Sequence, residues 1–191
     1  MAALARWRKQ FGDASPPVGN AYCQLARLAI DLRHFDEAQK WAERARPLLE
    51  ADGGNLPRLA MVLDLLGTIY RERGRAAAAV PLHERALQIR TQTNDLAELP
   101  NTLTALGLAL AATGNAAEAR ARLERAQTLR ASIDSDPQQA ATTAFGLART
   151  LPPSAAARAR TLAMSAFEGF TQGGPRFDYE RNEVRRWLDN H

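Results

Sequence analysis

The sequence predicts an all-α fold made of repeated helical hairpins, and three observations support this prediction. Ala, Leu and Arg supply 38, 25 and 23 of the 191 residues, and all three favour helix formation. Aromatic residues amount to only 6% and runs of Val or Ile are few, which disfavours β-sheet. The sequence also repeats itself at a spacing of 40–41 residues, which is typical of a repeat architecture.

Two alanines seven residues apart mark the second helix of each predicted hairpin. Each alanine recurs along the chain at steps of 41, 40 and 40 residues, and the last copy is the weakest. These small side chains are expected to face a closely packed neighbouring helix. The first series is Ala38, Ala79, Ala119 and Ala159, and the second is Ala45, Ala86, Ala126 and Ala166.

The first helix of each hairpin carries apolar or small residues at helical spacing, as in Leu63-x-x-Leu66-Gly67-x-x-Tyr70. This spacing gives a helix with one buried stripe, and Gly67 allows the partner helix to approach closely. Gly74 and Gly114 stand where a helix needs a left-handed cap. Prolines after the predicted loops are expected in the first turn of the following helix; they are Pro57, Pro100 and Pro137.

Leu66-Gly67-x-x-Tyr70, followed by Ala79 and Ala86, resembles the tetratricopeptide repeat. The 40–41-residue spacing and the early Pro81 resemble the longer-helix type of kinesin light chains and many bacterial signalling proteins. The resemblance implies a right-handed α-solenoid of helical hairpins closed by a C-terminal capping helix. His83 and Ala42 depart from the family pattern, because a large apolar residue is usual at both positions.

The repeats divide the chain into six predicted segments. Residues 1–14 are a partial or capping helix, either the remainder of a truncated preceding repeat or an N-terminal cap of its own. Residues 176–191 are an amphipathic helix that caps the other end. Between these helices lie three repeats at 18–50, 57–92 and 100–132, and a degenerate fourth repeat at 137–171.

Charge and cysteine content argue against several classes of protein. The formal net charge is +4 and the basic residues are spread along the chain, so no basic stripe indicates nucleic-acid binding. Cys23, the single cysteine, cannot form an internal disulfide, which fits a reducing compartment. No apolar run approaches the ~18 residues that a membrane span needs. We therefore expect a cytoplasmic protein that binds neither nucleic acid nor membranes.

The residues that could support catalysis or metal binding are scattered. Cys23, His34, His83 and His191 lack the spacing of a zinc site, and no glycine-rich phosphate loop is present. Cys23 is interpreted as a helix-surface or packing thiol and His83 as a tolerated core or edge histidine. The sequence thus predicts no enzyme activity, no cofactor and no metal.

The family resemblance also implies a binding surface, because partners of such repeats bind the concave face lined by the first helices. The repeat register predicts charged and polar residues in the N-terminal half of this face and smaller, more apolar residues in the C-terminal half. This mixture suits an extended peptide or a partner helix, and the alternative is a solvated face that binds nothing. The predicted partner-binding residues are Arg27, Asp31, Asp64, Thr68, Arg71, Thr104, Leu108 and Thr143.

The function favoured by the sequence is a non-catalytic scaffold that binds a peptide or helix of a partner protein. Two alternatives stay open. In the first, the chain is the C-terminal regulatory or sensory region of a larger bacterial signalling protein, such as a serine/threonine kinase. In the second, it is a module that self-associates through its N-terminal end.

Overall fold

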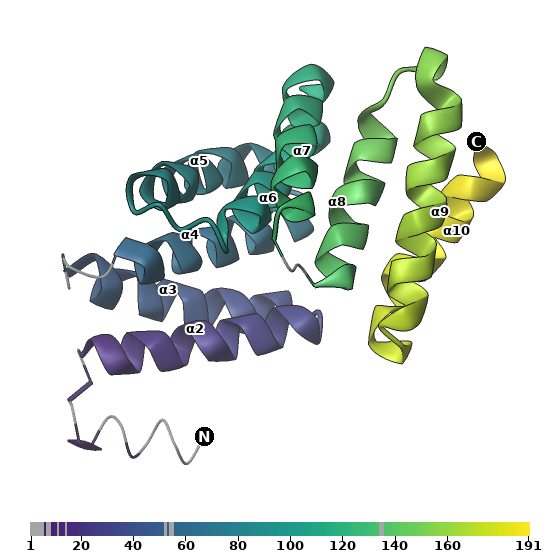
Figure 1. Cartoon of the computed structure of the whole chain (residues 1–191). Coiled ribbons are helices and arrows are strands. Elements are labelled where there is room, and N and C mark those ends of the chain that lie inside the picture. The colour runs from purple at the N-terminus through teal and green to yellow at the C-terminus, as the bar shows by residue number, and fades with distance from the viewer. Residues whose placement is uncertain are drawn as a thin grey trace. The chain divides into compact units, whose positions relative to one another are not determined.

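The computed structural model describes residues 6, 9–10, 12–13, 15–51, 53, 56–133 and 136–191. Within these ranges every element of regular secondary structure is helical (Figure 1). The chain forms two compact units, Met1–Leu96 and Ala97–His191. The predicted all-α fold of tetratricopeptide-like hairpins is confirmed, whereas the predicted helix at 1–14 falls mostly outside the described residues.

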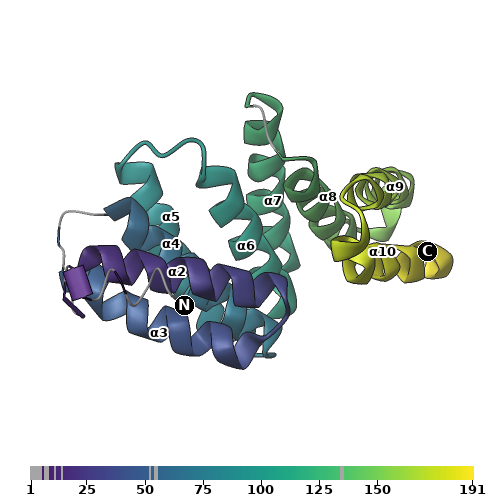
Figure 2. The ribbon, with the colours of Figure 1, turned by 90° about the horizontal axis from the view of Figure 1, so that it is seen from below.

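The first unit contains two antiparallel hairpins (Figure 2). Helices α2 (Pro16–Asp31) and α3 (Phe35–Ala51) form the first hairpin, and α4 (Leu56–Glu72) and α5 (Ala76–Gln92) form the second. Helix α3 packs against α4, and α2 also contacts α4. The first helices of successive repeats are therefore direct neighbours in this unit.

The second unit follows the same plan with one additional helix. Helices α6 (Leu99–Ala112) and α7 (Ala116–Ala131) pair, as do α8 (Pro137–Thr150) and α9 (Ala156–Gln172). The 3-10 turns η1 (Pro153–Ala155) and η2 (Pro175–Phe177) precede α9 and α10 (Asp178–Asn190). Helix α7 packs against α8, α6 contacts α8, and α10 packs on α9.

The repeated alanines and glycines lie where paired helices approach most closely. All eight alanines of the two series are buried. A Cβ added to Gly67 would lie 2.5 Å from Nε2 of His83, and a Cβ added to Gly107 would lie 2.6 Å from Cγ of Leu123. His83 thus occupies the core position that faces the paired helix, and a side chain at either glycine would push the helices apart.

The turns within the hairpins have the left-handed backbone expected from the sequence. Gly74 and Gly114 have φ angles of 74° and 87°, a region that glycine reaches without steric cost. Arg33 occupies the equivalent turn of the first repeat with a φ of 59°, although it has a side chain. The same turn geometry is therefore kept in three repeats with two different residue types.

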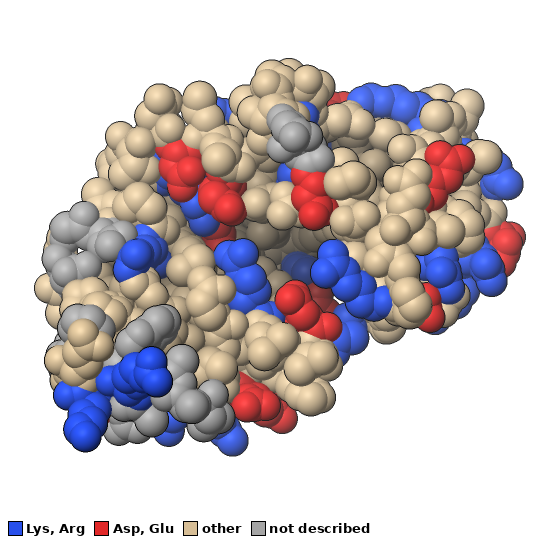
Figure 3. All heavy atoms as spheres, turned by 60° about the horizontal axis from the view of Figure 1, so that its bottom comes forward, with Lys and Arg blue, Asp and Glu red and all other residues tan. Residues whose placement is uncertain are grey.

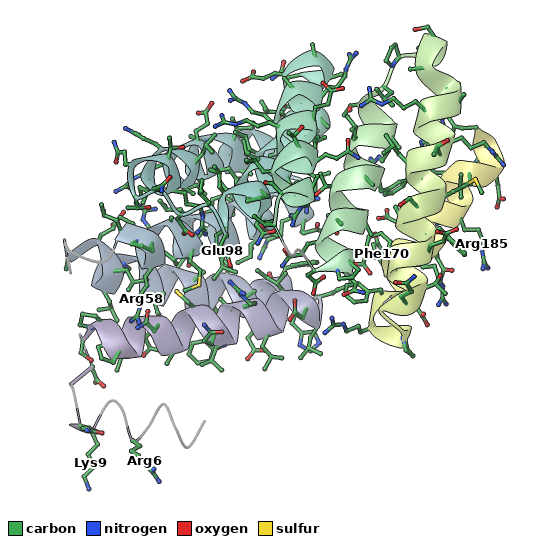
Figure 4. All side chains as sticks on the ribbon, viewed as in Figure 1. Arg6, Lys9, Arg58, Glu98, Phe170 and Arg185 are labelled. Atoms are coloured by element: carbon green, nitrogen blue, oxygen red, sulfur yellow. The ribbon has the colours of Figure 1, made fainter. Side chains whose placement is uncertain are left out.

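The last helix closes the core of the second unit. Val184 of α10 is fully buried against α9. Phe170 (labelled in Figure 4) is also buried and stacks on Phe177 at a centroid distance of 5.8 Å. Trp187 meets the ring of Phe145 edge-on at 6.3 Å. Helix α10 therefore covers apolar side chains of α8 and α9.

Candidate functional site

In the first unit, α2 and α4 carry four of the predicted binding residues on their accessible surfaces. Arg27 and Asp31 of α2 are exposed, and Thr68 of α4 is half-buried. The side chain of Arg71 is 25% exposed and pairs with Glu72 at 2.6 Å. Nε of Arg71 is buried with no hydrogen-bond partner in the described part of the chain. This surface therefore offers two guanidinium groups and a carboxylate to a partner.

Asp64, the fifth predicted residue in this unit, is held by neighbouring side chains. Its carboxylate accepts a hydrogen bond from Nδ1 of His83 at 2.9 Å and from Nε and Nη2 of Arg90 at 3.4 and 3.2 Å. Arg90 also donates to Asp95 at 2.7 Å. Since His83 and Arg90 are buried, Asp64 joins α4 to α5 inside the repeat.

In the second unit, two predicted residues face each other inside the protein. Thr104 of α6 and Thr143 of α8 are 4% and 1% exposed, and their hydroxyl oxygens lie 2.9 Å apart. Nε of Arg130 donates to the hydroxyl of Thr143 at 2.9 Å. The two threonines therefore join α6 to α8 and present almost no surface to a partner.

Leu108, the last predicted residue, also contributes to packing between first helices. It is half-buried, and its Cδ2 would lie 2.8 Å from a Cβ added to Gly146 of α8. Part of Leu108 remains accessible, so a binding role for it stays a prediction. The described structure thus divides the predicted residues between accessible surface and internal contacts.

Two buried arginines were not anticipated from the sequence. Arg90 and Arg130 are 4% and 7% exposed. They occupy the same repeat position, four residues after Ala86 and Ala126 of the second alanine series. The equivalent residues of the outer repeats are Leu49 and Phe170, both buried. The repeat alignment could have indicated this burial, because the same position carries an apolar residue in two repeats and arginine in the other two.

Cys23 is a packing residue. It is fully buried in α2, and burial raises the pKa of its thiol to about 12, although Arg27 and Arg58 act to lower it (Arg58 is labelled in Figure 4). A thiol with this pKa carries almost no thiolate near neutral pH, and the thiolate is the nucleophilic form. Of the two sequence interpretations of Cys23, the packing thiol is confirmed.

Other kinds of site find no support in the part of the chain that is described. Across these residues, no group of three His, Cys, Asp or Glu side chains is placed to hold a metal ion. None of the described helices has the length and apolar character needed to cross a bilayer. On the face shown in Figure 3, basic and acidic side chains are interspersed.

Comparison with known protein families adds independent support for the repeat assignment. Two family models, each described as tetratricopeptide repeat, match residues 35–92 and 19–45. A comparison with curated proteins found no match. Together the matched segments span residues 19–92, which include nearly all of the hairpins α2–α3 and α4–α5. These matches agree with the paired helices and their small-residue contacts, and they support tetratricopeptide repeats in this part of the chain.

Proposed function

We propose that the chain is a non-catalytic protein–protein interaction module that binds a partner segment on the surface shared by α2 and α4. Tetratricopeptide repeats generally mediate protein–protein interaction, and two family models cover the helices in question. The observation that carries the proposal is the accessibility of Arg27, Asp31 and Arg71 on neighbouring first helices. Guanidinium groups bind carboxylates through paired, charge-assisted hydrogen bonds, so a segment with acidic and polar side chains suits this surface.

The contacts of Asp64 determine how the proposal is tested. Replacing Asp64 would remove one of the two carboxylates that Arg90 binds inside the repeat. If such a variant failed to bind a partner, the cause could be disturbed helix packing and not a lost contact with the partner. The informative variant is Arg27→Ala/Asp31→Ala/Arg71→Ala, which removes two cations and one anion from accessible surface. We expect it to keep wild-type helicity and to lose the partner that the wild-type chain retains from a cell lysate.

A matched variant on the second helices controls for the change in charge. Lys40, Arg44 and Glu84 are exposed on α3 and α5, and replacing all three by Ala removes the same number of cations and anions. The proposal predicts that this variant retains the partner. A partner held equally by all three proteins would place binding elsewhere and refute the proposal.

One finer assignment belongs to the same proposal, and one alternative function stands beside it. The 40–41-residue spacing supports the longer, kinesin-light-chain-like repeat type and a role in a bacterial signalling protein. Self-association is the second candidate function, favoured by Leu28 of α2 and by Leu32, the residue that follows this helix, which are 54% and 57% exposed. If that surface joins two copies, Leu28→Glu/Leu32→Glu will abolish any dimer seen by light scattering. A wild-type chain that stays monomeric at high concentration would remove this candidate.

A further inference from the structure

A cleft of about 420 Å³ lies within the second unit, between α7, α8 and α9. Alanines of α8 form much of its lining. Helix α9 approaches α8 closely here, because a Cβ added to Gly169 would lie only 2.9 Å from Cβ of Ala141. Pockets for small ligands typically enclose about 300–1,000 Å³, so the volume suits a small molecule. The polar lining residues are Gln127, Arg130, Thr143, Ser165, Glu168 and Gln172.

Arg130 is the buried charged group of this cleft, and its hydrogen-bond partners among the described residues are neutral. Its side chain donates to Thr143 at 2.9 Å, to Oε1 of Gln139 at 3.1 Å and to Oδ1 of Asn101 at 2.7 Å. A guanidinium group carries five N–H donors. The three bonds leave two N–H groups without an acceptor among the described residues.

In the part of the chain that the structure describes, the charge of Arg130 also lacks a close counterion. Within the described ranges no carboxylate forms an ion pair with it, whereas Arg90 at the same repeat position pairs with Asp64 and Asp95. Burial lowers the pKa of Arg130, and Asp136 and Glu98 oppose this effect from a longer range. A buried cation without a paired anion is costly, so an anion that reached this guanidinium would be stabilised.

The remaining lining limits the kind of anion that fits. Glu168 is exposed and lines the same cleft, so a ligand with more than one negative charge would be repelled. The alanines provide a shallow apolar surface for the body of the ligand. Arg158 of α9 pairs with Glu124 of α7 at 3.2 Å, about one helical turn from the lining residues Leu162 and Gln127.

From these contacts we infer that the cleft binds a small monocarboxylate with a short apolar body. The carboxylate accepts hydrogen bonds from Arg130, and the apolar body lies on Ala140, Ala141 and Ala144. This site is separate from the partner surface proposed on α2 and α4. Its ligand is a free small acid and not a protein segment, so each proposal can fail without the other.

The test is a titration of the full chain with 3-methylbutanoate, followed by amide chemical shifts of α7, α8 and α9. Its neutral amide, 3-methylbutanamide, has nearly the same shape without the charge. We expect the acid to bind at least about ten-fold more tightly than the amide. Equal affinity for the two compounds, or no shift changes at about 10 mM acid, would overturn the inference.

Three variants identify the site. Arg130→Gln is expected to lose the acid, while Arg125→Gln, an exposed arginine of the same helix, is expected to bind as wild type does. Ala140→Leu keeps Arg130 and its hydrogen bonds but fills the cleft, so it too should lose the acid, whether or not Arg130→Gln folds. Glu168→Gln should tighten binding several-fold, because it removes the competing negative charge. Wild-type binding by Ala140→Leu would overturn the inference.

Discussion

The contact between Gly107 and Leu123 gives the most direct energetic test of the repeat packing. In Gly107→Ala, the new Cβ would lie 2.6 Å from Cγ of Leu123 and 3.1 Å from the backbone oxygen of Ala119. Leu123 is fully buried and cannot move into solvent. Overpacking of this kind costs about 1–3 kcal/mol, whereas replacing a helical glycine with alanine gains about 1 kcal/mol. The free energy of unfolding should therefore fall by about 0–2 kcal/mol.

Removing the Leu123 side chain should reverse the sign of this effect. Leu123→Ala alone leaves a cavity and is expected to cost about 2–5 kcal/mol. In that background the main clash is absent, so Gly107→Ala should become neutral or stabilise by up to about 1 kcal/mol through helix propensity. The predicted coupling between the two sites is about 1–3 kcal/mol.

The assay is urea unfolding followed by circular dichroism for the wild type, both single variants and the double variant. An unchanged dependence of the unfolding free energy on urea would show that the compared states are equivalent. If Gly107→Ala has the same effect with and without Leu123, then the close approach of α6 and α7 does not determine stability, and the proposed packing is wrong.

Three further predictions concern single residues. Gly74→Ala and Gly114→Ala should each cost about 1–2 kcal/mol through left-handed backbone strain alone, because no atom lies within 4 Å of the added Cβ; an unchanged unfolding midpoint would contradict the assigned turns. Arg90→Leu should cost about 3–5 kcal/mol in urea unfolding, because it removes a buried cation that pairs with both Asp64 and Asp95. The exposed Arg85→Leu, which breaks a pair with Glu50, should cost at most about 1 kcal/mol. Cys23 should react with a chromogenic disulfide reagent only after unfolding. In the folded chain the pKa of its thiol is about 12, above the ordinary value of 9.0. The buried neutral thiol therefore contributes to stability below pH 9.0, and this contribution declines as the pH rises above that value. The Cys23→Ala variant should lack this alkaline decline, and rapid labelling of the native chain would contradict the burial of the thiol.

The hairpin fold could be predicted from the sequence because its determinants are local and repeated. A glycine behind a leucine in the first helix and two alanines in the second define the contact between paired helices. Gly67 therefore indicated a close contact that the structure confirms, and Gly107, one repeat later, lies at an equally close contact. The glycine turns were equally predictable, because glycine reaches the left-handed region without steric cost. Arg33, which takes the same conformation in the first repeat, carried no such signal.

The binding surface was less predictable, because repeat register gives position along a helix but not the neighbours of a side chain. Asp64 and Thr104 occupy equivalent positions of two repeats, yet Asp64 is bound by Arg90 and Thr104 by Thr143. The deciding residues lie elsewhere in the chain, so no local pattern reveals them. A polar residue on a first helix can thus belong to the surface or to the packing between helices.

Photo-crosslinking from single positions of the first unit would show whether a partner contacts the surface shared by α2 and α4. A crosslinking amino acid would replace Arg27 or Thr68, on the proposed surface, or Gln88, which is exposed on α5. If α2 and α4 form the interaction surface, we expect one partner protein to be captured from Arg27 and from Thr68 but not from Gln88. Capture of that partner from Gln88, with none from Arg27 or Thr68, would contradict the claim that α2 and α4 form the interaction surface.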